Sequence, residues 1–176
     1  MITLELETFT AEHLPLVQPW FEHPEVDLRL GGPEWPARGL VLAESQDDEE
    51  FRGMRVLRSH TWLATYDGEP VGYVGGEVYD RWTVWDGQQV LAWEPGPAMG
   101  SAYVVDPSRW RHGFGRALLR AWVDAPEVAD VEVFALGIEH DNEASRRCAL
   151  SAGFRADDEV PDWEEIVYFT RRRARP

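Results

Sequence analysis

The 176-residue chain has little of what marks secreted, membrane-spanning or disulfide-stabilised proteins. Its one cysteine, Cys148, excludes an internal disulfide and is typical of a reducing cytoplasm. No apolar run approaches the roughly 18 residues that a membrane-spanning helix needs. The opening stretch MITLELETFT has no basic region followed by an apolar one. We therefore expect a cytoplasmic protein that carries no secretion signal.

Positive charge is also scarce, because 17 lysines and arginines stand against 32 aspartates and glutamates, a formal net charge of −15. A surface this acidic repels nucleic acid and anionic lipid, so we expect neither nucleic acid nor a membrane as a partner. An acidic surface suits a cationic small molecule or a basic peptide as partner. The alternative interpretation is that the acidity only keeps the protein soluble. The basic tail RRRARP is interpreted as a solvated end of the chain.

Hydrophobic residues make up 44% of the chain, and no repeat or long linker divides it, so we expect one domain spanning residues 1–176. Alternating apolar residues predict strands, and three- or four-residue spacing predicts helices. The expected strands are 2–9, a hairpin of 61–66 with 71–79, 98–105, 131–138 and 164–172. The expected helices are a short one capped by Thr10, one from Ser45 to about Arg58, 113–123 and one from Asn142 or Asp141 through Ser151.

Two segments rich in proline, glycine or tryptophan are predicted to be irregular. Residues 23–40 are expected to form a loop, and residues 80–97 a loop or an irregular strand. The element order then predicts an α/β (α+β) fold, with a central mixed sheet flanked by helices. The strand–helix–strand unit from 98 to 138 is expected to be parallel and right-handed.

A glycine-containing turn opens one of these helices. RWRHGFGRAL, residues 109–118, places Gly113 and Gly115 after an apolar strand and among basic side chains. A helix start leaves amides without partners and carries roughly half a positive charge, and glycine lets an anion approach the backbone. These residues alone fit either a polyvalent anion, such as a pyrophosphate, bound at the turn or a plain tight turn. Arg116 stands where a nucleotide-binding P-loop has lysine, and Leu118 where a dinucleotide site has its third glycine.

A second motif, NEASRRCALSAGF, spans residues 142–154. An asparagine at a helix start caps the helix and can also hydrogen-bond amide groups of a ligand. The small residues that follow allow a ligand or a neighbouring strand to come close. By itself, the motif is more typical of a well-capped amphipathic helix that ends in glycine, and only its distance behind the first motif favours a ligand contact.

Together, VVDPSRWRHGFGRALL and NEASRRCALSAGF resemble the GNAT superfamily of N-acetyltransferases, over roughly residues 60–170. The resemblance implies the GNAT-like acyl-CoA N-acyltransferase fold, with acetyl-CoA as cosubstrate and no metal. It also implies that the turn amides bind the pyrophosphate, that the preceding strand splays from its neighbour to hold the pantetheine arm, and that the second motif contacts that arm. The implied coenzyme-binding residues are Tyr103, Val104, Val105, Arg111, His112, Gly113, Phe114, Gly115, Arg116, Asn142 and Ser145.

Two positions depart from the family pattern. Trp110 stands where the family has arginine or glutamine, and Ala149 stands where many members have the tyrosine that protonates the leaving thiolate. Neighbouring Cys148 is interpreted as a small buried packing residue and not as a nucleophile. The first departure puts one side-chain contact to the coenzyme in doubt, and the second leaves the acid unassigned.

The resemblance implies direct attack of a primary amine on the acetyl thioester. A backbone N–H near Val104 is expected to polarise the thioester carbonyl. The amine must lose a proton, and Glu77 is the first choice of base because its strand is expected to flank the acceptor cleft. The alternative bases are Glu94, Glu139, His140 and Asp141.

The acceptor is expected to be a small cationic amine, an aminoglycoside-like compound or a peptide N-terminus. Trp82, Trp85 and Trp93 either fill the core or, as a group, wall the site of a bulky amine. The alternatives are a non-catalytic acetyl-CoA-binding regulatory domain and, less consistent with the motifs, a nucleotide-binding switch. Because dimers are common among similar proteins, a homodimer is kept open.

Overall fold

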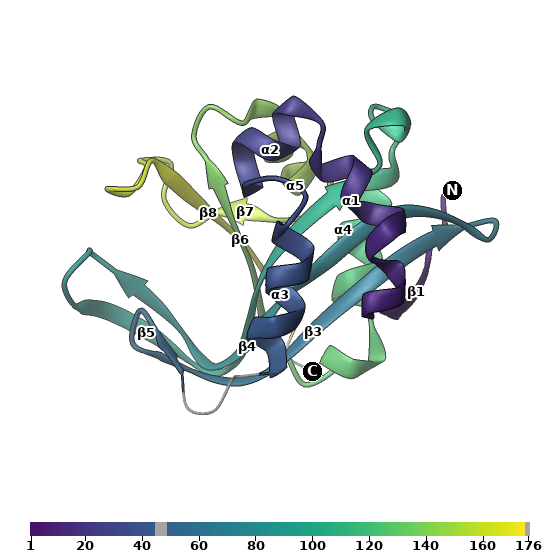
Figure 1. The fold of residues 1–176 in the computed structure, drawn as a ribbon. Coiled ribbons are helices and arrows are strands. Elements are labelled where there is room, and N and C mark those ends of the chain that lie inside the picture. The colour runs from purple at the N-terminus through teal and green to yellow at the C-terminus, as the bar shows by residue number, and fades with distance from the viewer. Residues whose placement is uncertain (45–48, 175–176) are drawn as a thin grey trace.

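The computed structural model describes residues 1–44 and 49–174, and its strands form one mixed eight-stranded sheet with helices on both faces (Figure 1). The strand order is β1-β3-β4-β5-β6-β8-β7, with β2 paired to β3. The strands are β1 Glu5–Thr8, β2 Glu50–Phe51, β3 Met54–Tyr66, β4 Glu69–Trp85, β5 Val90–Val105, β6 Val133–Glu139, β7 Arg155–Ala156 and β8 Ile166–Arg172. The predicted fold class is confirmed.

Five α-helices and three short 3-10 helices complete the described part of the chain. The α-helices are α1 Leu14–Phe21, α2 Pro24–Leu30, α3 Trp35–Glu44, α4 Phe114–Val123 and α5 Glu143–Ser151. The 3-10 helices are η1 Ala11–His13, η2 Pro107–Arg109 and η3 Pro126–Val128. None of the described helices has the length and apolar composition needed to span a membrane.

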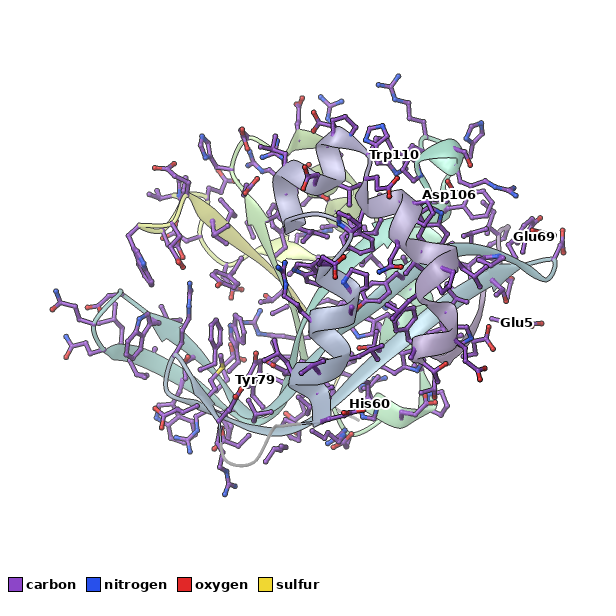
Figure 2. All side chains as sticks on the ribbon, in the orientation of Figure 1. Glu5, His60, Glu69, Tyr79, Asp106 and Trp110 are labelled. Carbon is purple, nitrogen blue, oxygen red and sulfur yellow. The ribbon has the colours of Figure 1, made fainter. Side chains whose placement is uncertain are left out.

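The predicted hairpin is confirmed and is longer than the sequence indicated. β3 turns into β4 through Asp67 and Gly68, whose φ angles of 51° and 79° suit the two-residue turn that matches strand twist. β4 then runs from Glu69 at this turn past Tyr79 into a second hairpin with β5 (Figure 2). Residues 80–97, predicted as loop or irregular strand, belong mostly to these two paired strands.

The segment 23–40, predicted as a loop, contains α2 and the first part of α3 instead. Pro24 is the first residue of α2, where the missing amide costs nothing, and His23 accepts a 3.3 Å hydrogen bond from the Glu25 amide. Gly31 ends the helix in the left-handed conformation, with φ of 100°. Proline and glycine here delimit a short helix and do not mark a loop.

The helix predicted from Ser45 to about Arg58 is also wrong over its described part. Ser45 lies outside the described residues, and from Glu50 onward the chain forms β2, a turn and β3. Arg52 and Gly53 have φ of 50° and 75° and form a turn between two strands. Phe51, Met54 and Leu57, whose three-residue spacing suggested a helix, therefore lie in strands. Met54 is buried and Leu57 is 44% exposed, as expected for side chains on opposite faces of a strand.

Helices cover both faces of the sheet, α1, α2 and α3 on one and α4 and α5 on the other (Figure 1). On the α4 face, Phe114, Leu118 and Trp122, spaced four residues apart along the helix, are all buried against the sheet. The Trp122 indole packs against Phe134 and Phe154 at ring distances of 5.1 and 5.9 Å. This core holds α4 against the sheet at the point where the glycine turn begins.

β5 and β6 are parallel, as predicted, but they pair over only three residues each. Ala98–Gly100 pair with residues 133–135, after which β5 continues to Val105 and β6 to Glu139 without pairing to one another. The two strands therefore separate within the sheet. A wedge opens toward the N-termini of α4 and α5.

Candidate functional site

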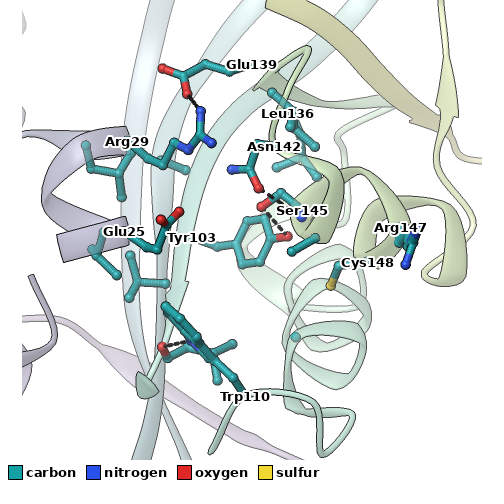
Figure 3. Close-up of a pocket in the computed structure, with 18 of the residues that line it drawn as sticks. Glu25, Arg29, Tyr103, Trp110, Leu136, Glu139, Asn142, Ser145, Arg147 and Cys148 are labelled. Carbon is teal, nitrogen blue, oxygen red and sulfur yellow. Dashed lines mark hydrogen bonds and ion pairs between the residues drawn. The ribbon is translucent and has the colours of Figure 1, made fainter. Parts of the chain in front are cut away.

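A cavity of about 970 Å³ occupies the wedge between β5 and β6 (Figure 3). Its walls come from α2, the separated part of β5, the turn before α4, the end of β6 and the first turns of α5. Of the predicted coenzyme-binding residues, this cavity brings together Tyr103, Val104, Val105, Arg111, Gly113, Gly115, Asn142 and Ser145. Residues as far apart in the sequence as Glu25 and Ile166 thus line one site.

The register of β5 decides which backbone groups face the cavity. The Asp106 amide donates to the Val71 carbonyl of β4 at 3.0 Å, and the Pro97 carbonyl accepts from Glu132 at 2.8 Å, next to β6. Because hydrogen-bonding direction alternates along a strand, the Val104 amide points to β4. The cavity-facing amides belong to Ser101, Tyr103 and Val105. The register therefore does not direct the Val104 amide, the expected carbonyl-polarising group, into the cavity, whereas the Tyr103 amide does face it.

The turn before α4 presents a run of amides to the cavity. Arg111 and Gly113 have φ of 65° and 87°, and Gly113 is the N-cap of α4. Within the described residues, no amide from 111 to 116 donates to another backbone carbonyl, and the first such bond is from Ala117 to Gly113, at 3.1 Å. These amides sit at the positive end of the helix dipole, as an anion site requires.

The basic side chains around the turn divide between two sides of α4. Arg109 and Arg111 line the cavity, whereas His112 and Arg116 line a separate pocket between α4 and the N-terminal segment. Phe114 is buried, with the Arg109 guanidinium 5.8 Å from its ring centre. His112, Phe114 and Arg116 can therefore contribute their amides to the cavity side, but their side chains lie elsewhere.

Trp110 fixes the turn to its surroundings. Its indole Nε1 donates to the Val105 carbonyl at 2.9 Å, and its ring meets the His23 imidazole at 4.6 Å between centres. The side chain at the position where the family has arginine or glutamine thus ties the turn to the end of β5 (Figure 3) and to the start of α2. We infer a structural role for it, next to an anion site built from backbone.

On the opposite wall, α5 begins as predicted. The Asn142 Oδ1 accepts a hydrogen bond from the Ser145 amide at 3.2 Å, and the Ser145 Oγ lies 3.1 Å from the Tyr103 hydroxyl. Tyr103 reaches across the wedge from β5 to α5 (Figure 3). Burial raises the pKa of Tyr103 well above its ordinary value, so the hydroxyl stays protonated and able to donate.

Cys148 packs between the two helices that flank the cavity. A Cβ on Gly115 would lie 2.7 Å from its sulfur, so the second glycine of the turn is needed for close helix packing. Burial raises the pKa of the Cys148 thiol, which favours the unreactive protonated form. These contacts support the interpretation of Cys148 as a packing residue.

An ion-pair cluster that the sequence did not predict lies on the cavity wall between α2 and the end of β6. The Arg29 guanidinium of α2 pairs with Glu139 at the end of β6 (Figure 3) and, at 2.6 Å, with Asp141. These carboxylates raise the pKa of Arg29, and Arg29 lowers the pKa of Asp141. His140 lies 3.2 Å from Glu165. Three of the alternative bases, Glu139, His140 and Asp141, are thus engaged with other side chains. Sequence analysis missed this cluster because no local pattern links Arg29 to residues about 110 positions away.

Glu77 lies outside the cavity lining but beside its inner end. It pairs with Gly100, the last β5 residue that pairs with β6, and directly paired side chains share a face of the sheet. That face carries α1, α2 and α3, since it also holds buried Tyr73. The Tyr79 hydroxyl donates to the Glu77 carboxylate at 2.7 Å, and burial raises the pKa of Tyr79.

The tryptophans do not form one wall. Trp82 is buried and its Nε1 donates to Asp157 at 3.1 Å, whereas Trp93 is 57% exposed. Trp82 pairs with Glu94 and the next residue pairs with Trp93, which puts the two indoles on opposite faces of the hairpin. Glu94, another alternative base, forms an ion pair with Arg172.

Two buried polar atoms lack a hydrogen-bond partner among the described side chains, and both belong to residues that line the cavity. They are the Arg29 Nε and the Ser101 Oγ. A buried polar group without a partner costs about 1–3 kcal/mol, so such groups occur where a ligand or water completes them. No cluster of metal-ligating side chains is found among the described residues.

Comparisons with known proteins agree with this geometry. Residues 18–154 match the family described as "Acetyltransferase (GNAT) family". The chain is 26% identical over 150 residues to the "Uncharacterized N-acetyltransferase YfmK" of Bacillus subtilis (strain 168), covering 85% of this chain and 83% of that protein.

Solved structures share the fold at low identity. The aminoglycoside acetyltransferase AAC(6')-Ib, in complex with paromomycin and acetyl-CoA, superposes with a TM-score of 0.70 at 20% identity, over 97% of this chain and 94% of that one. RimL, the ribosomal L7/L12 alpha-N-protein acetyltransferase in complex with coenzyme A, gives 0.63 at 16% identity over the same shares.

Proposed function

Because the chain belongs to the GNAT family of acetyltransferases, we propose that it transfers the acetyl group of acetyl-CoA to a primary amine by direct attack. The observation that carries the proposal is the wedge between β5 and β6, which opens beside a helix N-terminus whose turn amides have no backbone partner. One end of the cavity suits a pyrophosphate. The inner end lies next to a carboxylate, where an amine can be deprotonated.

The residues of the cavity fit the parts of the coenzyme. The amides of residues 111–116 hold the pyrophosphate, and the Tyr103 carbonyl and the Val105 amide, which face the cavity, bond the amides of the pantetheine arm. Asn142 and Ser145 line the opposite wall. The buried polar atoms without partners support a ligand that brings its own hydrogen-bonding groups.

The chemistry needs a thioester, a base and a carbonyl-polarising donor. Acetyl-CoA supplies the activated acyl thioester. The Tyr103 amide donates to the carbonyl oxygen as negative charge develops there, in place of the Val104 amide expected from the family pattern. Glu77 accepts the proton that the attacking amine loses, directly or through water, and Tyr79 holds the Glu77 carboxylate in place.

The acceptor class is a primary amine that carries positive charge when free in solution. A net charge of −15 attracts such molecules, and proteins of the same fold include enzymes described as aminoglycoside and ribosomal-protein acetyltransferases. We therefore propose a small cationic amine, an aminoglycoside-like compound or a peptide N-terminus as acceptor.

Calorimetry and a thiol-release assay test the proposal together. Coenzyme A and acetyl-CoA are expected to bind with measurable heat, and ATP at the same concentration is expected to bind more weakly. With a panel of polyamines, aminoglycosides and short peptides, at least one acceptor should release free thiol faster than background hydrolysis.

The failure outcomes are distinct. Absence of heat with coenzyme A contradicts the assigned cavity. Coenzyme binding without turnover on any amine contradicts catalysis and favours the alternative, a non-catalytic acetyl-CoA-binding regulatory domain.

A further inference from the structure

Ser101 lies at the inner end of the cavity, where β5 and β6 part. Gly100 is the last β5 residue that pairs with β6, so Ser101 is the first residue on the open side of the wedge. Its partner on β4 is Gly76, which has no side chain to cover the hydroxyl. The side chain therefore stands at the narrowest part of the wedge.

The Ser101 hydroxyl is buried and has no hydrogen-bond partner among the described residues. The flanking side chains on the same face of β5 are Met99, which is fully buried, and Tyr103, whose hydroxyl is 3.1 Å from Ser145. A serine whose only role is to fill space would leave its hydroxyl group desolvated at a cost that alanine avoids. The hydroxyl is expected to be satisfied by something that enters the cavity.

The position along β5 identifies which part of the coenzyme arrives there. From Val105, beside the pyrophosphate turn, to Ser101 the strand advances four residues, or about 13 Å. That is comparable to the reach of an extended pantetheine arm. The thioester end of the arm therefore lies near Ser101 when the pyrophosphate occupies the amides of residues 111–116.

We propose that the Ser101 hydroxyl donates a hydrogen bond to the carbonyl oxygen of the acetyl thioester, together with the Tyr103 amide, and is a further catalytic residue. The inference rests on the proposed function, because it requires acetyl-CoA in the wedge. This hydrogen bond strengthens as the amine attacks, because the carbonyl oxygen gains negative charge when the nitrogen–carbon bond forms. When the carbon–sulfur bond breaks, the carbonyl re-forms and the charge leaves with the thiolate.

Binding of two coenzyme forms separates this role from packing. Ser101→Ala is expected to weaken acetyl-CoA binding by about 3- to 10-fold, the loss of one neutral hydrogen bond, and to leave the Kd of coenzyme A unchanged because that molecule has no acyl carbonyl. The kcat for amine acetylation should fall on the order of 100-fold. The Tm of the coenzyme-free variant should stay equal or rise, because a desolvated group has been removed.

Thr83→Val is a matched control with the opposite pattern. Thr83 is also a buried hydroxyl residue, but its Oγ1 donates to the Arg52 carbonyl at 2.8 Å and it lies outside the cavity lining. Its replacement should lower the Tm and leave both coenzyme affinities unchanged. Ser101→Cys keeps the side-chain shape with a weaker donor. It should weaken acetyl-CoA binding less than Ser101→Ala does, and it should also leave the Kd of coenzyme A unchanged.

Three results would overturn the inference. They are an unchanged Kd of the Ser101 variants for acetyl-CoA, an equal loss for coenzyme A and acetyl-CoA, and a fall in Tm like that of Thr83→Val. If the wild-type protein binds neither coenzyme form, the proposed function itself fails. If it binds both and Ser101→Ala behaves like the wild type, only the role of Ser101 is refuted.

Discussion

Two glycines of the same turn have different physical roles. Gly113 adopts a φ of 87°, and only Ile2 approaches the place of a Cβ there, at 3.6 Å, so conformation is the reason for glycine. Gly115 is helical, and a Cβ there would lie 2.7 Å from the Cys148 sulfur. The first glycine shapes the turn of the proposed anion site, and the second lets α4 and α5 approach one another.

The contact at Gly115 predicts a non-additive pair of substitutions. Gly115→Ala should destabilise the protein by about 1–3 kcal/mol, because the added methyl group overpacks the contact with Cys148. Adding Cys148→Ala should recover much of the loss, since it removes the sulfur. Denaturant unfolding of the two single variants and the double variant measures the coupling. Additive free energies of unfolding would show that the clash lies elsewhere.

The proposed base gives a second prediction at this scale. Glu77→Gln should lower kcat by about 100-fold or more, because the amide accepts no proton, while the Kd of acetyl-CoA stays unchanged. Glu94→Gln is the control, since Glu94 is an alternative base whose exposed pair with Arg172 contributes little to stability. The assignment would be reversed if the Glu94 variant lost turnover and the Glu77 variant kept it.

At the scale of secondary-structure elements, Arg29 links α2 to the opposite wall of the cavity. Its partners are Glu139, the last residue of β6, and Asp141, which lies between β6 and α5, so α2 and that wall are fastened together. Arg29→Gln should increase amide hydrogen exchange in residues 24–30 while exchange in α4 stays the same. Arg147→Gln is the control, because Arg147 forms an ion pair with Glu143 within one helix. Equal exchange in α2 of Arg29→Gln and the wild type would contradict the fastening role.

The same cluster predicts a dependence on pH. The pKa of Asp141 is lowered by Arg29 in the folded protein, so its contribution to stability is present above the unfolded pKa and is lost as the pH falls through the folded value. The Tm difference between the wild type and Arg29→Gln should therefore shrink below about pH 4. Thermal unfolding between neutral and acidic pH measures it, and a difference that persists in acid would exclude the carboxylates as its source.

At the scale of the whole molecule, the net charge of −15 acts on the encounter with an acceptor. If the acceptor is a polycationic amine, its KM should rise with ionic strength, because salt screens the attraction over about 8–10 Å. An uncharged amine analogue of similar size should show no such rise. Steady-state assays between low and physiological salt compare the two, and equal salt dependence would argue against a charge-selected acceptor.

The sequence by itself determined the pieces that depend on neighbouring residues. The Asp67–Gly68 turn, the apolar face of α4 and the Asn142 cap follow from local spacing and backbone preference, and the motifs around Gly113 and Asn142 indicated the family. Local reasoning failed in residues 23–40, where Pro24 and Gly31 bound a helix, and at Glu50–Phe51, where a turn converts apparent helical spacing into strands.

Only the tertiary structure decided the rest. The separation of β5 from β6 after Gly100, the direction of the Val104 and Tyr103 amides and the pairing of Arg29 with Glu139 depend on which strands and helices meet. The Ser101 hydroxyl could be singled out only from the structure, because burial without a hydrogen-bond partner among the described residues depends on how the chain packs around it. Local sequence encodes turns, caps and apolar faces through short-range sterics, whereas register and cavity position follow from contacts between residues far apart in the chain.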